Sequence, residues 1–263
     1  MIALVFADKN LFLRFNTLSM KPFLFKINAL IKNLLIFFQP HVLFSFLIQP
    51  FAFFSNFLSL TQWIAKQPKQ GVYKDAFSLF RNYNHRIDLY NYVIEKENLS
   101  NTEIIYIEMG VCNGNSFTWW MQNNHHTASK FHGFDTFEGL PEQWGYFFKN
   151  GDMIAEAPKL EDARGQFYKG LFQDTLVPFL NNGNVSKEKR KIIHLDADLF
   201  SSTLFSLSML YPYLEKGDIV FFDEFNVPNH EYLAFKIFTE SFYVKLELLG
   251  AVNNYYQTAF VVK

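Results

Sequence analysis

The stretch "YIEMGVCNGNS", residues 106–116, decides the fold, because it joins the end of one apolar run to the start of the next through two glycines. The run "EIIYIEMGV" predicts a buried strand, and "NSFTWWMQNN" predicts a helix that begins after Gly114. Glycines at such a turn let the backbone bend sharply and approach a ligand closely. The spacing Glu-x-Gly-x-x-x-Gly differs from the Gly-x-Gly-x-x-Gly of dinucleotide folds, which favours a ligand without phosphates over a pyrophosphate. A plain tight turn is the alternative.

Strand and helix patterns alternate through the rest of the chain. Strands are predicted at "FHGFDTF", "RKIIHLDADL" and "DIVFFDEF", with helices between them, and "YVKLELLG" and "QTAFVVK" predict two closing strands. This alternation predicts an α/β fold: a Rossmann-like, doubly wound, mostly parallel sheet with helices on both faces. The long loop over residues 138–160 contains Gly, Pro and aromatic residues, and its length predicts a lid.

Residues 76–99, "AFSLFRNYNHRIDLYNYVIEKENL", carry apolar side chains at helical spacing. This pattern predicts a helix that packs against the sheet and places Phe77 and Phe80 on its buried face together with Leu89 and Tyr90.

The first 66 residues differ from the remainder. Asp8 is their only acidic residue, and between Lys32 and Lys66 there is no charged residue at all. This apolar run exceeds the roughly 20 residues that cross a bilayer, but Pro40 and Pro50 interrupt it. We therefore predict a hydrophobic, basic, helical N-terminal extension over residues 1–66 and a separate domain over residues 67–263.

Three roles for this extension stay open. Basic residues followed by aromatic-rich helices are typical of a segment that lies on an anionic membrane surface. The alternatives are a cap or homodimer element that buries its phenylalanines on protein, and a true membrane span. A secretory signal peptide fits poorly, because the basic part is long and no small-residue cleavage site follows.

The overall composition excludes several classes of protein. With 24 basic and 25 acidic residues, the chain does not suggest a nucleic-acid partner. Its single cysteine, Cys112, excludes an internal disulfide framework and a thiolate-rich zinc site. A lone thiol fits a reducing compartment, so we predict a cytoplasmic protein, at the cytoplasmic face of the membrane if the extension binds lipid.

An acidic residue, Asp135, ends the second predicted strand, 21 residues after Gly114. An acid at this place can accept both hydroxyls of a ribose. Together with the turn it predicts a site for a nucleoside-containing cofactor, formed by Glu108, Gly110, Gly114, Ser116 and Asp135.

Two further acids, Asp196 and Asp223, end the strands predicted at "RKIIHLDADL" and "DIVFFDEF". If those strands are neighbours, they lie about 4.8 Å apart, so both carboxylates can reach one cation, and Glu224 supplies a third oxygen. Ligands that are all oxygen indicate a hard ion, Mg²⁺ rather than zinc. The alternative is a set of hydrated loop acids. Asp198 is interpreted as the cap of the following helix or as a residue behind the ligands, and Ser201 or Ser202 could cap that helix equally well.

The motifs resemble those of the class I S-adenosylmethionine-dependent methyltransferases, and more narrowly the macrocin O-methyltransferase type. The resemblance covers roughly residues 75–263 and rests on five stretches in order: "IEMGVCNGNS", "FHGFDTFEGLPE", "KGLFQDTL", "LDADLFSST" and "GDIVFFDEF". It implies a seven-stranded sheet with a final antiparallel strand, and Mg²⁺-dependent methyl transfer from S-adenosylmethionine to a hydroxyl of a sugar or glycosylated small molecule. The family's metal ligands carry over onto Asp196, Asp223 and Glu224, although many relatives have Asp at the last position.

For the general base we predict His230, which follows the metal strand and opens a helix, whereas His194 lies inside a strand and is expected to be packed. Glu231 could orient a ligand instead. Two other functions stay open. Asp-Ala-Asp after an apolar strand also holds the metal of glycosyltransferases, which would leave the glycine turn without a role. The second is a membrane-docked, non-catalytic scaffold. A scaffold has no need for unpaired buried carboxylates, which argues against this alternative.

Overall fold

The computed structural model describes residues 9–145 and 147–263, with side chains from residue 20 onward. The chain forms two compact units, one that ends at Ala52 and one from Phe53 to Lys263.

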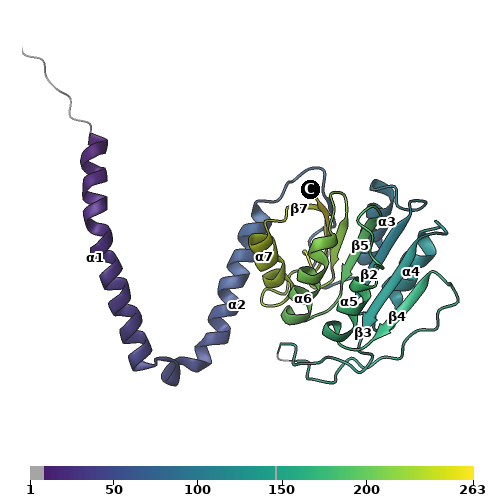
Figure 1. The fold of residues 1–263 in the computed structure, drawn as a ribbon, viewed down its shortest axis with the longest axis horizontal. Helices are drawn as coiled ribbons and strands as arrows, with labels where there is room; N and C mark the ends of the chain where they lie inside the picture. Colours follow the sequence, from purple (N-terminus) through teal and green to yellow (C-terminus); the bar gives the residue numbers. More distant parts are fainter. Residues whose placement is uncertain (1–8, 146) are drawn as a thin grey trace, which may run out of the picture. The chain divides into compact units, whose positions relative to one another are not determined.

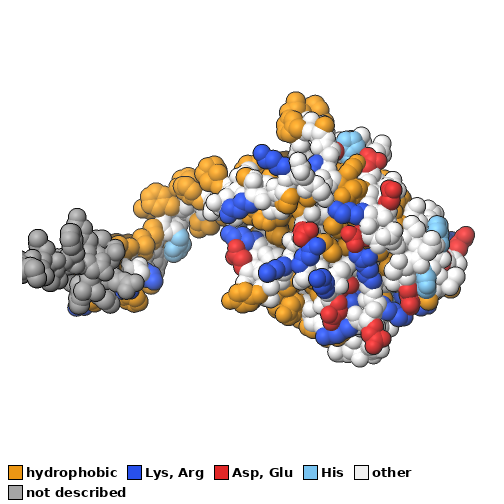
Figure 2. Space-filling model, turned by 90° about the horizontal axis from the view of Figure 1, so that it is seen from above, with side chains coloured by type: hydrophobic (Ala, Val, Ile, Leu, Met, Phe, Trp, Pro, Cys, Tyr) orange, Lys and Arg blue, Asp and Glu red, His pale blue; other side chains and the backbone are white. Residues whose placement is uncertain are grey.

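The first unit is helical. It contains α1 (Lys9–Phe38) and the first half of α2 (His41–Ala65). The helical conformation is interrupted between them at Gln39, whose φ is +46°. Pro50 lies inside α2, which continues through it. Figure 2 shows hydrophobic side chains along the described part of these helices. Within the described residues, α2 is the one helix whose length and hydropathy would allow it to cross a membrane.

The second unit is built on one eight-stranded sheet with the order β1-β7-β8-β6-β5-β2-β3-β4. The strands are β1 (Tyr73–Lys74), β2 (Ile104–Met109), β3 (Lys130–Asp135), β4 (Gly165–Lys169), β5 (Arg190–Leu195), β6 (Ile219–Phe222), β7 (Leu246–Val252) and β8 (Gln257–Val262). Every neighbouring pair is parallel except those made by β8, which runs antiparallel to β6 and β7. The predicted mostly parallel sheet with one antiparallel strand is confirmed, and the two-residue β1 adds an eighth strand at the edge.

Helices cover both faces of this sheet (Figure 1). They are α3 (Asn84–Lys96), α4 (Asn115–Asn123), α5 (Phe172–Asn181), α6 (Phe200–Leu210) and α7 (Glu231–Phe242), with a 3-10 turn at Tyr211–Tyr213. Alternate residues of β2 enter two different cores: Tyr106 packs with α3 and α4, whereas Ile107 packs with α5, α6 and α7. Burial on both faces explains why the strands read as continuous apolar runs.

The C-terminal half of α2 belongs to this second core. Leu60 is 1% exposed, and the Trp63 ring lies 5.0 Å from the Phe225 ring and 5.4 Å from the Phe235 ring, measured between centroids. The Ser59 hydroxyl also hydrogen-bonds the Tyr232 hydroxyl at 2.9 Å. Residues of the predicted extension therefore form part of the packing of the domain.

The helix predicted over residues 76–99 begins only at Asn84. Asn82 ends the preceding irregular stretch, because its backbone N–H donates to Asn253 and its side chain accepts from the Asn84 backbone N–H. Phe77 and Phe80 precede the helix and are 78% and 83% exposed. Their predicted burial is wrong, because the apolar spacing extends to residues before Asn84, where the helix actually begins.

Candidate active site

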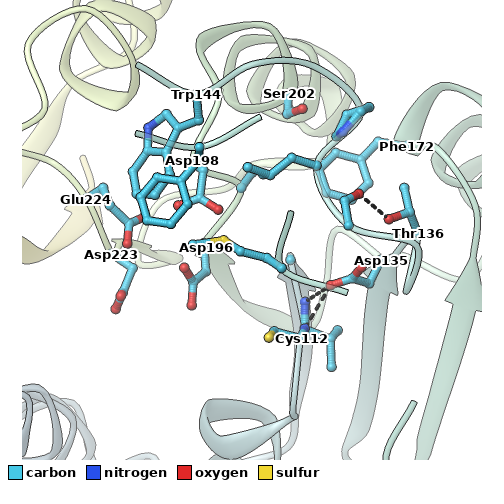
Figure 3. Close-up of a pocket in the computed structure, with 18 of the residues that line it drawn as sticks. Cys112, Asp135, Thr136, Trp144, Phe172, Asp196, Asp198, Ser202, Asp223 and Glu224 are labelled. Carbon is cyan, nitrogen blue, oxygen red and sulfur yellow. Dashed lines mark hydrogen bonds between the residues drawn. The ribbon is translucent and has the colours of Figure 1, made fainter. Parts of the chain in front are cut away.

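A cavity of about 860 Å³ opens at the carboxyl ends of the central strands (Figure 3). Its wall combines residues from the turn after β2, the end of β3, the tips of β5 and β6, and the start of α3. Of the predicted site residues it includes Gly110, Ser116, Asp135, Asp196, Asp223 and Glu224. This is the edge where ligands bind to open parallel sheets.

The turn after β2 requires its glycines. Gly110 has φ +95°, and a Cβ on it would overlap the backbone carbonyl oxygen of Asp196. Gly114 occupies the N-cap position of α4 with φ +72°, and a Cβ there would lie 2.5 Å from the Pro158 side chain. The glycine turn and the acid-bearing tip of β5 are therefore in direct contact, which couples the two predicted sites.

Asp135 holds the shape of this turn. One carboxylate oxygen accepts the backbone N–H groups of Val111 and Cys112, both at 2.8 Å (Figure 3). The other accepts the backbone N–H of Phe137 at 2.7 Å. Each carboxylate oxygen can accept more than one hydrogen bond, so Asp135 can fix the turn and still accept a ligand hydroxyl.

Two predicted cofactor residues, Glu108 and Gly114, are not among the residues that line the cavity. Glu108 is 1% exposed and accepts a hydrogen bond of 2.7 Å from the Tyr106 hydroxyl. Burial raises the pKa of Glu108 to about 8, although the Tyr106 hydrogen bond acts in the opposite direction. Glu108 is thus buried behind the cavity wall, as a carboxyl group that stays protonated at neutral pH.

We expect Glu108→Gln to flatten the pH dependence of stability. Between its ordinary pKa of 4.5 and about 8, the folded protein holds a proton on Glu108 that the unfolded chain has lost. The free energy of unfolding of the wild type therefore falls as pH rises through this window, by at most about 1.4 kcal/mol per pH unit from this group. Urea unfolding at pH 5 and pH 8 should show a smaller loss in the variant. The exposed Glu156→Gln is the control, and parallel curves for wild type and Glu108→Gln would contradict the assignment.

The acids converge at the tips of the adjacent strands β5 and β6. Carboxylate oxygens of Asp196, Asp198 and Glu224 lie within 4.8 Å of one another, and Asp196 forms a second such group with Asp223 and His194. Among the described residues, Asp196 is thus common to both groups, and Figure 3 shows Asp198 and Glu224 on one side of it. The structure brings the predicted ligands together, with Asp223 and Glu224 in different groups.

The electrostatics of these acids fit a cation. Burial, reinforced by neighbouring carboxylates, raises the pKa values of Asp196 and Glu224 and raises that of Asp198 to about 7. Within the described chain, Asp223 Oδ1 and Glu224 Oε2 are buried without a hydrogen-bond partner. Buried carboxylate oxygens without donors are costly, and a set of oxygen ligands suits Mg²⁺.

Arg86, in the first turn of α3, is a site residue that the sequence reasoning missed. Its Nη1 lies 3.1 Å from Asp223 Oδ2 and 3.8 Å from Asp196 Oδ2. Although burial acts to raise the pKa of Asp223, the nearby His194 and Arg86 hold it below its ordinary value. A signal was present, because Arg86 shares the buried face of its helix with Leu89 and Tyr90, where a charge needs a partner.

Glu224 is oriented by two neighbours. Its backbone N–H donates to Glu231 Oε2 at 2.8 Å, and its Oε1 accepts from the Tyr256 hydroxyl at 3.1 Å. Glu231 is fully buried at the start of α7. It therefore positions the backbone of a predicted ligand rather than facing the cavity.

The two histidines lie behind the cavity wall. His230 occupies the N-cap position of α7, its Nδ1 accepts a 3.4 Å hydrogen bond from the Phe200 backbone, and it is not among the lining residues. His194 is buried in β5 and contacts two tyrosine hydroxyls, as expected for a packed residue. The predicted capping of α6 by Asp198, Ser201 or Ser202 is wrong: the N-cap is Leu199, without a side-chain cap.

The predicted lid contributes to the cavity wall. Leu140, Glu142, Trp144, Phe148 and Met153 of the loop line it, and the Trp144 and Phe148 rings stack at 4.8 Å between centroids. The cavity lining therefore contains aromatic side chains from the loop as well as the acids of the strand tips.

Comparison with known proteins agrees with this architecture. A family model described as a methyltransferase domain matches residues 107–225. The solved structure of CalS11, a calicheamicin methyltransferase, is similar with a TM-score of 0.54 and 19% identity over 79% of this chain and 91% of that one. The O-methyltransferase NovP is also similar, with a TM-score of 0.48 and 18% identity over 66% of this chain and 78% of that one. So is the Podospora anserina methyltransferase PaMTH1, with a TM-score of 0.42 and 14% identity over 68% of this chain and 79% of that one. A search of curated proteins finds no match.

Proposed function

We propose that this chain is a class I S-adenosylmethionine-dependent methyltransferase that moves the methyl group to a hydroxyl of a sugar or glycosylated small molecule with the help of Mg²⁺. One observation supports this above the others: the Gly110 turn and the acids at the tips of β5 and β6 open into the same cavity. The acceptor class follows from the macrocin-type resemblance of the motifs.

The residues of the cavity divide into two functions. Asp135 and the Gly110 turn would hold the nucleoside part of the cofactor, since both line the cavity and Asp135 fixes the turn by accepting the Val111 backbone N–H. Asp196, Asp223 and Glu224 would hold Mg²⁺, which when bound favours the deprotonated form of an acceptor hydroxyl. The transfer itself is an in-line displacement, so the main task of the protein is to position the two reactants.

Trp144 and Phe148 would cover the reacting groups and exclude water. The role of His230 as the general base stays a prediction. Its Nδ1 accepts a hydrogen bond from the Phe200 backbone, and the residue is not among those that line the cavity.

Transfer of a labelled methyl group tests this proposal. The full chain, incubated with methyl-labelled S-adenosylmethionine and a panel of nucleotide sugars, glycosylated small molecules and lipid-linked sugars, should label at least one sugar hydroxyl. Excess chelator should abolish the transfer. The glycosyltransferase alternative predicts instead that a sugar is moved from UDP-sugars, and the scaffold alternative predicts turnover of neither donor.

For the N-terminal helices we propose attachment to an anionic membrane surface. From residue 20 to residue 52, large apolar side chains such as Phe25 (79% exposed) and Phe37 (78% exposed) are open to solvent, and Lys21, Lys26 and Lys32 are exposed beside them. The described part of this segment contains no acidic residue. Apolar and cationic side chains together match a surface that offers acyl chains and negative headgroups.

We expect the full chain to float with vesicles that contain anionic lipid, and to float less with neutral vesicles or at high salt. Replacing Lys21, Lys26 and Lys32 by glutamate should remove most of the binding to anionic vesicles. Replacing the exposed Lys187, Lys189 and Lys216 of the second unit in the same way is the control. A homodimer element would instead give a stable dimer by sedimentation without vesicle binding, and a true span would resist both charge changes and carbonate extraction.

A further inference from the structure

We propose that Arg86 serves as the cation of the acid site when no metal is bound, and that a divalent ion entering between Asp196 and Asp223 has to move its guanidinium group aside. This inference rests on the metal-binding part of the proposed function. It assigns Arg86 as a positioning residue that sets the affinity of the site for metal.

The position of the guanidinium group supports this role. A single nitrogen, Nη1, faces both carboxylates, at 3.1 Å from Asp223 Oδ2 and 3.8 Å from Asp196 Oδ2. These acids end neighbouring strands, so the gap between them is where a shared cation would lie. Arg86 therefore places a positive charge at the position that the sequence assigns to a metal ion.

The charge balance of the site needs such a cation. Four carboxylates line this part of the cavity, and Asp223 is only 4% exposed on its side chain. A buried carboxylate left without a partner is strongly destabilising, and several together repel one another. Arg86 neutralises part of this charge and so allows the site to fold without metal.

The anchoring of Arg86 is weak enough for displacement. Within the described residues, its side chain makes one hydrogen bond, to Asp223, and its buried Nε makes none. Its helix also begins here, directly after Tyr83, which itself lines the cavity. A guanidinium group held only by the carboxylates it neutralises can leave when a divalent ion takes those carboxylates.

Direct competition follows from geometry. Mg²⁺ binds carboxylate oxygens at about 2.0–2.1 Å, so an ion shared by Asp196 and Asp223 would lie within a few ångströms of Nη1. Two positive charges at that separation repel each other strongly in a partly buried site. Removing the guanidinium group should therefore strengthen metal binding.

The test compares Mn²⁺ binding by calorimetry in the full-length wild type, Arg86→Met and Arg81→Met. Arg81 is the matched control: it also lines the cavity, but it stacks on Tyr256 with its guanidinium carbon 3.3 Å from the ring centroid, and it is in no ion pair of the described chain. We expect Arg86→Met to bind Mn²⁺ at least about tenfold tighter than wild type, and Arg81→Met to stay within about twofold. Arg86→Lys keeps the charge but not the forked guanidinium group, so its Mn²⁺ affinity should lie between those of wild type and Arg86→Met.

Thermal melting gives a second readout that needs no activity. In chelator Arg86→Met should melt well below wild type and recover when Mn²⁺ is added, whereas wild type should change little. If wild type binds Mn²⁺ and Arg86→Met binds it equally or more weakly, the inference is overturned, and Arg86 orients Asp223 as a ligand instead. If neither protein binds Mn²⁺, the metal part of the proposed function fails as well. If Arg86→Met does not fold, Arg86→Lys decides by the same comparison.

Discussion

Gly110→Ala should lose about 100-fold or more in affinity for S-adenosylmethionine, because its new Cβ would overlap the backbone carbonyl oxygen of Asp196. Backbone atoms cannot rotate away as a flexible side chain can, so the turn after β2 or the tip of β5 has to move. Either movement displaces the wall of the cofactor site. Equilibrium dialysis with labelled S-adenosylmethionine measures the loss, and methyl transfer should fall with it.

Gly71→Ala is the matched control for this variant. Gly71 has a similar positive φ of +77°, but a Cβ on it would meet nothing within 4 Å. Both substitutions therefore carry the cost of a left-handed alanine, about 1–2 kcal/mol, and only Gly110→Ala adds the clash. Cofactor affinity in Gly71→Ala should remain near that of wild type. Equal affinities in all three proteins would show that the Gly110 turn does not face the cofactor.

Asp196→Asn should weaken Mn²⁺ binding by about 100-fold or more, since Asp196 belongs to both groups of converging acids. Asparagine keeps the shape of the side chain and removes its charge, so the loss reports on charge and ligation rather than on packing. Metal-dependent methyl transfer should fall in parallel. Calorimetry with Mn²⁺ measures the effect directly.

The exposed acid Asp174, in the first turn of α5, gives the control variant Asp174→Asn. It removes the same charge from the chain at a place outside the cavity lining. Metal affinity should then be unchanged. Unaltered Mn²⁺ binding in Asp196→Asn would exclude the shared-cation arrangement, whatever Asp223 and Glu224 do.

Much of the sheet could be predicted from the sequence, because strands buried on both faces give continuous apolar runs. The runs that end at Met109, Asp135, Leu195 and Phe222 lie in the central parallel strands. The start of α3 could not be predicted from periodicity, since Phe77 and Phe80 continue the apolar spacing while the Asn82 contacts with Asn253 begin the helix later. Such a contact joins positions distant in sequence and leaves no local pattern.

In the candidate site, too, some features could be predicted from the sequence and others could not. The parallel register of β5 and β6 brings Asp196 and Asp223 to one edge, as strand-end acids predict. The place of Arg86 on the buried face of its helix indicates that it needs a partner, but those partners lie more than 100 positions away and only tertiary packing brings them together. Glu108 lies behind the cavity wall since successive strand residues point to opposite faces.

The most direct test of the account is whether the full chain retains labelled S-adenosylmethionine in equilibrium dialysis. We predict one molecule bound per chain, with or without Mg²⁺, and a loss of at least about tenfold in affinity in Asp135→Ala, which removes the acceptor of three backbone N–H groups at the turn. No retention of S-adenosylmethionine under either condition, together with retention of a UDP-sugar, would contradict the account and favour the glycosyltransferase alternative.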